Sequence, residues 1–473
     1  MAGKWRAWIG HRFGLQNFKK HVLDRRIPRT SWYQGDGAAL LILLLTLVIT
    51  GMFMTPTYTP TAEGAHASVR YITHEQLLGW FVRGLHYWSA GLMVTMVLVH
   101  MFRQILVAGY KFPREGTWMI GVVMLFLVIT MGFIGYTLRW DERAIYALRV
   151  AMNMFWRVPW IGDELVVFIQ GGETIGERTL PRLFAVHVIF VPALLLTLVS
   201  WHVYLVIIHG VTSRAERTEP IPTVEDHERV YREAKQSEEG GEVFHPVTTA
   251  RTGAVGFAVF LLALGLTLGL GPPAIEPEAN LVQTAFPAEE WYFAWYSGLI
   301  ALLPPAVAPW FVVGFPILVF VVLISLPLVD RGPNRGFRRR PAAVVVVVVL
   351  VAALLILTDL RRRSAWTGWP EPEPPPVPAT VRLSPEAERG RQLFAKYGCT
   401  SCHAVAGYGR EVGPDLARIS PPMSAFELQR YIANPPEGVA MPSYEDALSE
   451  QELGQLAAFV LVVQSIKGES REE

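Results

Sequence analysis

The stretch GLHYWSAGLMVTMVLVH, residues 84–100, decides the fold, because it carries two histidines inside an apolar run that is long enough to cross a membrane. These are His86 and His100, which have the spacing i, i+14. A second apolar run, AVHVIFVPALLLTLVSWH at residues 185–202, places His187 and His202 at the spacing i, i+15. At about 100° per residue each pair returns to within about 40° to 60° of one helix face, about 21 to 23 Å apart along the axis. Each helix therefore offers one imidazole near each of its ends.

Histidines inside membrane helices are costly, so each needs a reason. Two helices with matched separations can hold two flat macrocycles by bis-imidazole ligation of the iron, one near each membrane surface. We therefore expect two b-type hemes, an outer one between His86 and His187 and an inner one between His100 and His202. The alternative is that the histidines hydrogen-bond across the bundle, which is the better explanation for a lone histidine but not for two matched pairs.

The composition places the rest of the chain in a membrane as well, since 51% of its 473 residues are hydrophobic and 18% are charged. The net charge is only +1, and no nucleic-acid partner is expected. The sequence predicts an all-α protein: a bundle of about seven transmembrane helices followed by a small helical domain. The seven spans are predicted at residues 37–56, 77–101, 117–138, 181–208, 250–271, 309–329 and 341–359.

The lysines and arginines indicate the topology. They concentrate in segments 1–36, 102–116, 209–249 and 330–340, which the positive-inside rule assigns to the cytoplasm. We expect a multi-pass protein of the bacterial cytoplasmic membrane, with a cytoplasmic N-terminus and with everything after the seventh span outside. Arg361 to Arg363 run against this majority.

Five regions are predicted along the chain. The basic, amphipathic N-terminus, Met1 to Arg29, is expected to form a helix on the lipid surface, with no cleavable signal peptide; a disordered basic tail is the alternative. A proline-rich stretch after the last span is typical of a stiff, extended linker. The regions are an N-terminal surface helix at 1–36, a four-helix di-heme core at 37–215, a three-helix part at 216–360, a linker at 361–383 and a soluble domain at 384–473.

Glycine spacing adds support to the histidine pattern. Gly37 and Gly51 on the first span, and Gly121 and Gly135 on the third, also have the spacing i, i+14. A macrocycle face needs close approach of a helix backbone, and glycine has no Cβ to block it. Arg83, one turn before His86, is a candidate partner for a heme propionate, or it simply extends toward the membrane surface.

The last domain carries a covalent heme-attachment motif, Cys399-Thr400-Ser401-Cys402-His403. Two thiols bind the heme vinyl groups and His403 supplies one axial ligand, which predicts one c-type heme. A thiol redox pair or half a zinc site are alternatives that the adjacent histidine disfavours. Gly413-Pro414-Asp415-Leu416 resembles the loop of small class I cytochromes c whose proline carbonyl orients the ligand histidine. Met441 is the expected sixth ligand, with Met423 as the alternative.

With these motifs the chain resembles the cytochrome b family of the bc and bf complexes over about residues 20 to 360. The longer spacing of His187 and His202 is similar to that of the bf and Gram-positive branch. Similar stretches follow the third span, at Gly135 to Asp141, and precede the seventh, at Asn334 to Pro341. Glu289-Glu290-Trp291-Tyr292 resembles the Pro-Glu-Trp-Tyr motif of the outer quinol-oxidation site.

The resemblance implies a catalytic role for Glu290 as acceptor of a quinol proton, with Tyr136 and Tyr292 lining the same pocket. A carboxylate on an aromatic-rich loop at the outer face can pass protons to the exterior. The alternative is an ordinary surface acid on a loop.

The chain also departs from the family pattern. Trp32 to Gly35 has no thiol where the bf branch anchors an extra heme, so a third covalent heme there is not expected. Ile207 and Ile208 replace basic residues near the inner quinone site, which leaves His209 nearby. Glu289 and Arg139 replace prolines and can reshape the outer pocket.

The resemblance implies a quinol:cytochrome c oxidoreductase subunit that oxidises quinol at the outer face in a Q-cycle coupled to proton translocation. It implies a Rieske iron-sulfur partner, an extracytoplasmic cytochrome c or terminal oxidase as acceptor, and a homodimeric complex. An alternative is a membrane anchor whose b and c hemes relay electrons for a separate dehydrogenase or reductase. A transporter that uses the histidines as proton relays would not need the heme-attachment motif.

Overall fold

Among the residues that the computed structural model describes, seven helices are long and apolar enough to cross a membrane. They run over Trp32–Met54, Gly79–Val107, Glu115–Thr137, Thr179–His209, Phe244–Leu270, Trp310–Val329 and Pro341–Arg363. The structure describes residues 5, 8, 10, 12–13, 19–156, 158, 160–172, 174–211, 223–236, 241–276, 278, 290–304, 307–363, 374–378, 380–401, 403–409, 413–419, 421–436, 441, 443–445 and 448–465. The helices confirm the predicted fold class and lie within six residues of the predicted ends.

The first four spans form one packed unit. The first two spans lie against each other as α3 (Asp36–Met54) and α5 (Gly79–Val107), and α6 (Glu115–Thr137) packs against the fourth span. That fourth span is continuous through α9 (Thr179–Ala185), the π-helical turn η3 (Val186–Phe190) and α10 (Val191–His209). The four-helix unit therefore brings the two histidine-bearing helices into one bundle.

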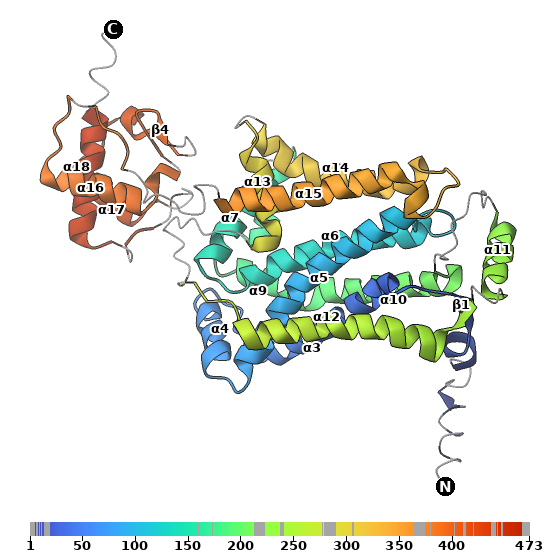
Figure 1. Cartoon of the computed structure of the whole chain (residues 1–473). Helices are drawn as coiled ribbons and strands as arrows, with labels where there is room; N and C mark the ends of the chain where they lie inside the picture. The colour runs from blue at the N-terminus through green and yellow to red at the C-terminus, as the bar shows by residue number, and fades with distance from the viewer. Residues whose placement is uncertain are drawn as a thin grey trace.

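The later spans cover this unit from two sides. α12 (Thr249–Leu270) packs on α3 and α5, whereas α14 (Ala308–Val329) packs on α6. The short helix α13 (Ala294–Ala301) packs on α15 (Pro341–Arg363), and Figure 1 shows α13, α14 and α15 together along one edge of the bundle.

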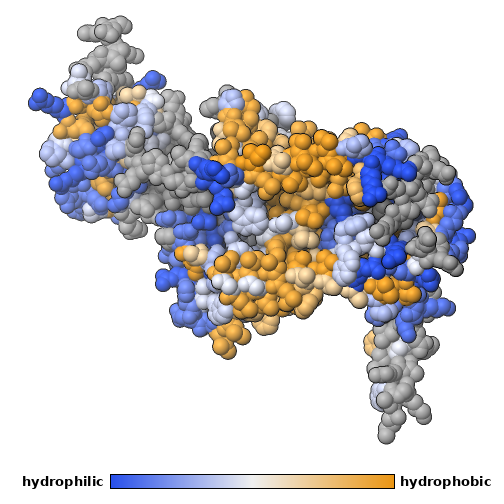
Figure 2. Space-filling model, in the orientation of Figure 1, coloured by the Kyte–Doolittle hydropathy of each residue, from blue (hydrophilic) through white to orange (hydrophobic). Residues whose placement is uncertain are grey.

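The two ends of the bundle differ from its middle. α4 (Ala65–His74) and α7 (Glu142–Trp156) lie at one end, called here the outer end, and α11 (Val224–Gln236) lies at the other, the inner end (Figure 1). Figure 2 shows apolar residues in a belt across the middle, with hydrophilic residues at both ends. Such a belt is what a lipid-exposed bundle requires, and the protein is a multi-pass membrane protein.

In the N-terminal segment, the predicted helix does not continue to Arg29. After the turn η1 (Lys19–Leu23), strand β1 (Arg26–Pro28) pairs antiparallel with β2 (Gly241–Val243), and a 3₁₀ turn, η2 (Trp32–Gly35), leads into α3. A partner strand so far away along the chain leaves no periodic signal in the local sequence.

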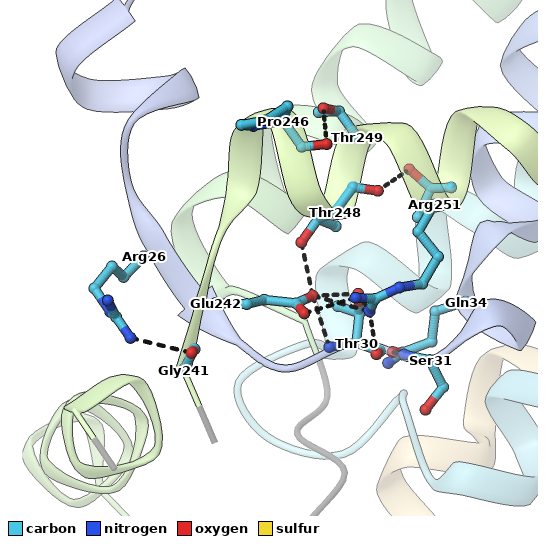
Figure 3. Close-up of polar contacts among 11 residues, drawn as sticks. Arg26, Thr30, Ser31, Gln34, Gly241, Glu242, Pro246, Thr248, Thr249 and Arg251 are labelled. Atoms are coloured by element: carbon cyan, nitrogen blue, oxygen red, sulfur yellow. Dashed lines mark hydrogen bonds and ion pairs between the residues drawn. The ribbon is translucent and has the colours of Figure 1, made fainter. Parts of the chain in front are cut away.

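A polar cluster fixes this strand pair (Figure 3). The Glu242 carboxylate accepts hydrogen bonds from the Thr30 hydroxyl at 2.7 Å and the Thr248 hydroxyl at 2.7 Å, and it pairs with Arg251 at 2.9 Å. Although burial alone would raise it, the Arg251 guanidinium and the threonine groups lower the pKa of Glu242 to about 2. The cluster therefore ties the N-terminal segment to the start of α12.

The outer end has its own small core. The helices α7 and α8 (Gly162–Gln170) pack together, and α8 also packs on α9. The buried side chains of this core include Trp140, Leu148 and Leu180. It covers the outer end of the third and fourth spans with ordered helices rather than open loops.

The C-terminal domain is a small helical unit beyond the outer end in Figure 1. α16 (Pro385–Lys396) packs against α18 (Glu450–Ser465), and α17 (Ala425–Ala433) packs against α18 as well. Ser384 caps α16 by accepting a hydrogen bond from the backbone of Ala387, and Ser449 and Glu452 form a capping box at the start of α18. The ring centres of Phe394 and Phe459 lie 5.5 Å apart in its core.

Candidate functional site

The four membrane histidines meet in two pairs. The ring centres of His86 and His187 lie 6.4 Å apart, and those of His100 and His202 lie 6.5 Å apart. Two imidazole nitrogens bound to one metal at about 2.0 Å each, with each nitrogen about 1.1 Å from its ring centre, separate the ring centres by about 6 Å. The rings of each pair therefore stand at about the separation at which both imidazoles could bind one shared metal ion.

A π-helical turn explains why the i, i+14 spacing on one helix matches the i, i+15 spacing on the other. The turn η3 contains His187, and the backbone N–H of Val191 bonds to the carbonyl of Val186, five residues earlier. Pro192 follows directly and has no N–H for the ordinary bond. Such a turn adds one residue without adding a turn of helix, so the longer spacing spans about the same distance as the shorter one.

A cavity of about 300 Å³ surrounds the outer pair. Its wall is largely apolar, and it also includes Arg83, Tyr87 and Arg139. Arg83 donates to the Thr73 hydroxyl at 3.2 Å and to the Pro273 carbonyl at 2.9 Å, so its buried guanidinium is held at the cavity wall. A guanidinium in that place suits the carboxylate of a ligand in the cavity.

Each of the four spaced glycines faces one histidine. A Cβ added at Gly135 would lie 2.8 Å from Cε1 of His187, and one at Gly121 would lie 3.4 Å from Cε1 of His202. The corresponding distances are 3.5 Å from Gly51 to His86 and 3.9 Å from Gly37 to His100. At Gly135 the missing Cβ thus makes room for the imidazole ring of His187 itself, whereas a Cβ at Gly51 or Gly37 would make an ordinary van der Waals contact.

The second ring nitrogens of the histidines have different neighbours. Nδ1 of His86 lies 2.9 Å from the Thr50 hydroxyl, whereas Nδ1 of His100 lies 3.2 Å from the carboxylate of Asp36. Nδ1 of His187 is buried without a hydrogen-bond partner among the described residues. Ring separation, cavity and glycines together fit two bis-imidazole hemes, for which His86, His187, His100 and His202 would be the ligands.

The predicted acid Glu290 is buried close to the outer pair. Its carboxylate lies 3.3 Å from the guanidinium of Arg139 and accepts a hydrogen bond from the Tyr87 hydroxyl at 3.1 Å. Only 2% of Glu290 is exposed, so it is not a surface acid. Arg139 also lies 3.2 Å from the buried carboxylate of Asp141. Glu289 lies outside the described residues.

An aromatic cluster lies at the wall of the outer cavity. Tyr136 packs against Phe133 and Phe293 with ring centres 5.5 and 6.3 Å apart. Tyr292 donates to the carbonyl of Gly132 at 3.2 Å, and burial raises the pKa of its phenol well above the usual value. Both tyrosines line the cavity of the outer pair, and Tyr292 stays a hydrogen-bond donor at neutral pH.

The heme-attachment motif lies at the start of the C-terminal domain. Nδ1 of His403 lies 2.9 Å from the carbonyl of Pro414, the contact expected for an oriented axial ligand. Cys399 packs against the domain core, as do Met441 and Met423, so both methionines remain candidates for the sixth ligand. Cys402 lies outside the described residues.

Three family models match the chain. Residues 25–211 match the model described as cytochrome b/b6/petB, and residues 278–368 match cytochrome b(C-terminal)/b6/petD. Residues 385–460 match cytochrome C oxidase, cbb3-type, subunit III. The cytochrome b of Allochromatium vinosum is 31% identical over 347 residues, which make up 70% of this chain and 81% of that protein.

The chain belongs to the cytochrome b family. Cytochrome b6 of Rippkaea orientalis and of Synechocystis sp. are 32% and 33% identical over 206 residues, 43% of this chain and 93% of each relative. A solved structure titled "Hyperthermophilic respiratory Complex III" is similar with a TM-score of 0.65 and 27% identity, covering 76% of this chain and 91% of that one. The protein is thus a bc-type cytochrome b with a C-terminal cytochrome c domain, and its work is electron transfer.

The sequence alone did not predict which side chains contact the histidines and Glu290 of this cytochrome b. Asp36, Arg103 and Tyr87 each contact a predicted site residue or its neighbour, and Arg139 was noted only as a replaced proline. One signal was available for Asp36, because an acid at the start of an apolar span needs a partner.

Proposed function

We propose that the chain is the cytochrome b/c fusion subunit of a quinol:cytochrome c oxidoreductase. His86 and His187 would hold the outer b heme, His100 and His202 the inner one, and Cys399, Cys402, His403 and Met441 the single c heme. When bound, these hemes supply one-electron carriers between the two membrane faces and toward an outside acceptor. The substrate would be a membrane quinol, which loses two electrons and two protons to become the quinone.

The observation that carries the proposal is the place of Glu290. This acid is buried, and its two polar partners, Tyr87 and Arg139, are both in the wall of the outer cavity. An acid in that position can accept a proton from a quinol hydroxyl and release it at the outer end. Tyr136, Tyr292 and their aromatic neighbours would exclude water and lie against the quinol ring.

The partners follow from the chemistry and from the family. The chain has only two cysteines, both in the heme-attachment motif, so the iron-sulfur acceptor of the first electron must come from a Rieske partner. An extracytoplasmic cytochrome c or a terminal oxidase would accept electrons from the c domain. We also propose a homodimeric complex in a bacterial cytoplasmic membrane, with a cytoplasmic N-terminus and an outside c domain. The predicted regions at 37–215, 216–360, 361–383 and 384–473 belong to the same proposal.

The test is Glu290→Gln in the whole complex, with Glu276→Gln as the matched control. Glu276 is also at the outer end, where it pairs with Arg143 at 2.7 Å, but it is half-exposed. We expect Glu290→Gln to lose most quinol-dependent cytochrome c reduction with all three hemes retained, and Glu276→Gln to keep it. The heme content is measured first, by pyridine hemochrome spectra and by heme staining of a denaturing gel.

The same experiment decides between this function and a second candidate, a membrane anchor that relays electrons for a separate dehydrogenase or reductase. An anchor has no use for a proton acceptor beside the outer pair. Unchanged quinol turnover in Glu290→Gln would overturn the proposal, and fewer than two b hemes per chain would overturn the assignment of the histidine pairs.

A further inference from the structure

We infer that Asp36 is a positioning residue that lowers the midpoint potential of the inner b heme by binding its ligand His100. The inference rests on the two-heme assignment proposed above. It concerns the inner heme alone and does not depend on quinol chemistry at the outer cavity.

The geometry joins three side chains at the inner ends of α3 and α5. Oδ2 of Asp36 lies 3.2 Å from Nδ1 of His100. Arg103 binds the same carboxylate in a bidentate way, from Nε to Oδ2 at 2.6 Å and from its terminal nitrogen to Oδ1 at 2.9 Å. The backbone N–H of Gly37 also donates to Oδ1 at 2.8 Å. Asp36 is 4% exposed, so the carboxylate is held out of water in one orientation.

The protonation of His100 decides the direction of the hydrogen bond. If Nε2 binds the iron, Nδ1 carries the proton and must donate it. Arg103 is also within 3.5 Å of Nδ1, but a guanidinium has no acceptor to offer. Asp36 is therefore the acceptor, and Arg103 keeps its carboxylate in place.

The four candidate ligands differ in the group that lies next to Nδ1 of the imidazole. His86 has the neutral hydroxyl of Thr50, and Nδ1 of His202 is buried without a hydrogen-bond partner among the described residues. Nδ1 of His187 is buried without a partner within the described part of the chain. Among the described residues, His100 alone has a carboxylate, so the two b hemes would differ in the basicity of their ligands.

The sign of the effect follows from charge. A carboxylate that accepts from Nδ1–H makes the imidazole a stronger electron donor, which favours ferric over ferrous iron and lowers the potential. Replacing Asp36 by a neutral residue also leaves the positive charge of Arg103 uncompensated near the heme, which favours the ferrous form. Both effects of the replacement raise the potential, so they do not cancel.

The experiment is an equilibrium redox titration of the b hemes in the whole complex, comparing the wild type with Asp36→Asn. We expect the midpoint potential of one b heme to rise by about 59 mV, which corresponds to a tenfold change in the equilibrium constant of a one-electron reduction. The midpoint potential of the other b heme should stay unchanged. His202→Leu, which removes an inner ligand, identifies the inner wave because that wave disappears. Asp36→Glu keeps a carboxylate and should stay nearer to the wild-type value.

Two controls test whether the shift is specific to the contact between Asp36 and His100. Glu115→Gln removes another acid at the inner end, at the start of α6, and should leave both midpoints unchanged. Asp36→Ser is a second neutral variant that suits the start of a helix, and low-spin electron paramagnetic resonance signals verify that both b hemes are retained.

The inference would be overturned by an unchanged inner midpoint potential in Asp36→Asn, or by an equal shift of both b-heme midpoint potentials in that variant. The same shift of the inner midpoint potential in Glu115→Gln would also overturn it. Loss of the inner heme in both neutral variants would show that Asp36 has a structural role instead. Fewer than two b hemes in the wild type would instead refute the two-heme assignment.

Discussion

The guanidinium of Arg139 lies 3.3 Å from the carboxylate of Glu290, and both side chains are buried. The same guanidinium lies 3.2 Å from the fully buried carboxylate of Asp141. One guanidinium thus lies between two carboxylates beside the outer pair of histidines. This ion pair holds the proposed proton acceptor beside the outer cavity, whose wall includes Arg139.

Replacement of Arg139 should destabilise the outer end. Arg139→Gln would leave Glu290 and Asp141 buried without their shared cation, and breaking a buried ion pair on one side costs about 3 to 5 kcal/mol. We expect a clearly lower temperature of thermal unfolding, followed by circular dichroism and by the loss of b-heme absorbance. Arg139→Lys, which keeps the charge, should recover part of the loss.

Arg143→Gln is the control for this prediction. Arg143 also follows the third span and pairs with Glu276 at 2.7 Å, but both side chains are partly exposed. Partly exposed pairs contribute about 0 to 1 kcal/mol. Equal losses in Arg139→Gln and Arg143→Gln would contradict the view that the burial of the pair matters.

The glycines give a prediction about heme content. Gly135→Ala would place a Cβ 2.8 Å from Cε1 of His187, closer than real contacts allow, so this ligand would have to move. We expect the variant to lose the outer b heme and to hold about half of the wild-type b heme in pyridine hemochrome spectra.

Gly37→Ala makes the same chemical change on the first span, where the nearest atom of His100 is 3.9 Å away. That distance is ordinary van der Waals contact, so we expect full b-heme content. If both alanine variants retain two b hemes, the glycines are ordinary packing residues.

The helices and the histidine pairs could be predicted from the sequence, because both depend on local periodicity. Apolar runs of about 20 residues predict spans, and an i, i+14 spacing predicts a shared face. The π-helical turn at His187 could not be predicted in this way, although Pro192 was a sign of an irregular bond. The turn explains why His187 and His202, with the longer spacing, still lie opposite His86 and His100.

The partners of the site residues could not be predicted, because they depend on contacts between distant segments. Asp36 and Arg103 are 67 residues apart, and Glu290 reaches Arg139 from another loop. The β1–β2 pair, which replaced the end of the expected N-terminal helix, has the same origin. In each case the packing of the spans brings the two segments together, and local propensity carries no information about it.

The two methionines of the c domain can be separated by their spectra. If Met441 is the sixth ligand, Met441→Ala removes the thioether and should lower the midpoint potential of the c heme, with loss of the absorption band of methionine ligation. Met423→Ala removes a methionine from the same core and should keep both properties. The reverse result would assign the ligand to Met423.

The cluster around Glu242 predicts how stability at the inner end depends on pH. The Glu242 pKa is lowered from its usual 4.5 to about 2, so the folded state favours the carboxylate. This stabilisation is fully present above about pH 4.5 and is lost as the pH falls toward 2, because the unfolded chain then binds the proton first. We expect the wild type to be about 1 to 3 kcal/mol more stable than Glu242→Gln at pH 6, measured by thermal unfolding in detergent. The difference between the two proteins should shrink steadily below pH 4.5, whereas a difference that stays constant down to pH 3 would mean that the hydrogen bonds of the cluster matter and its charge does not.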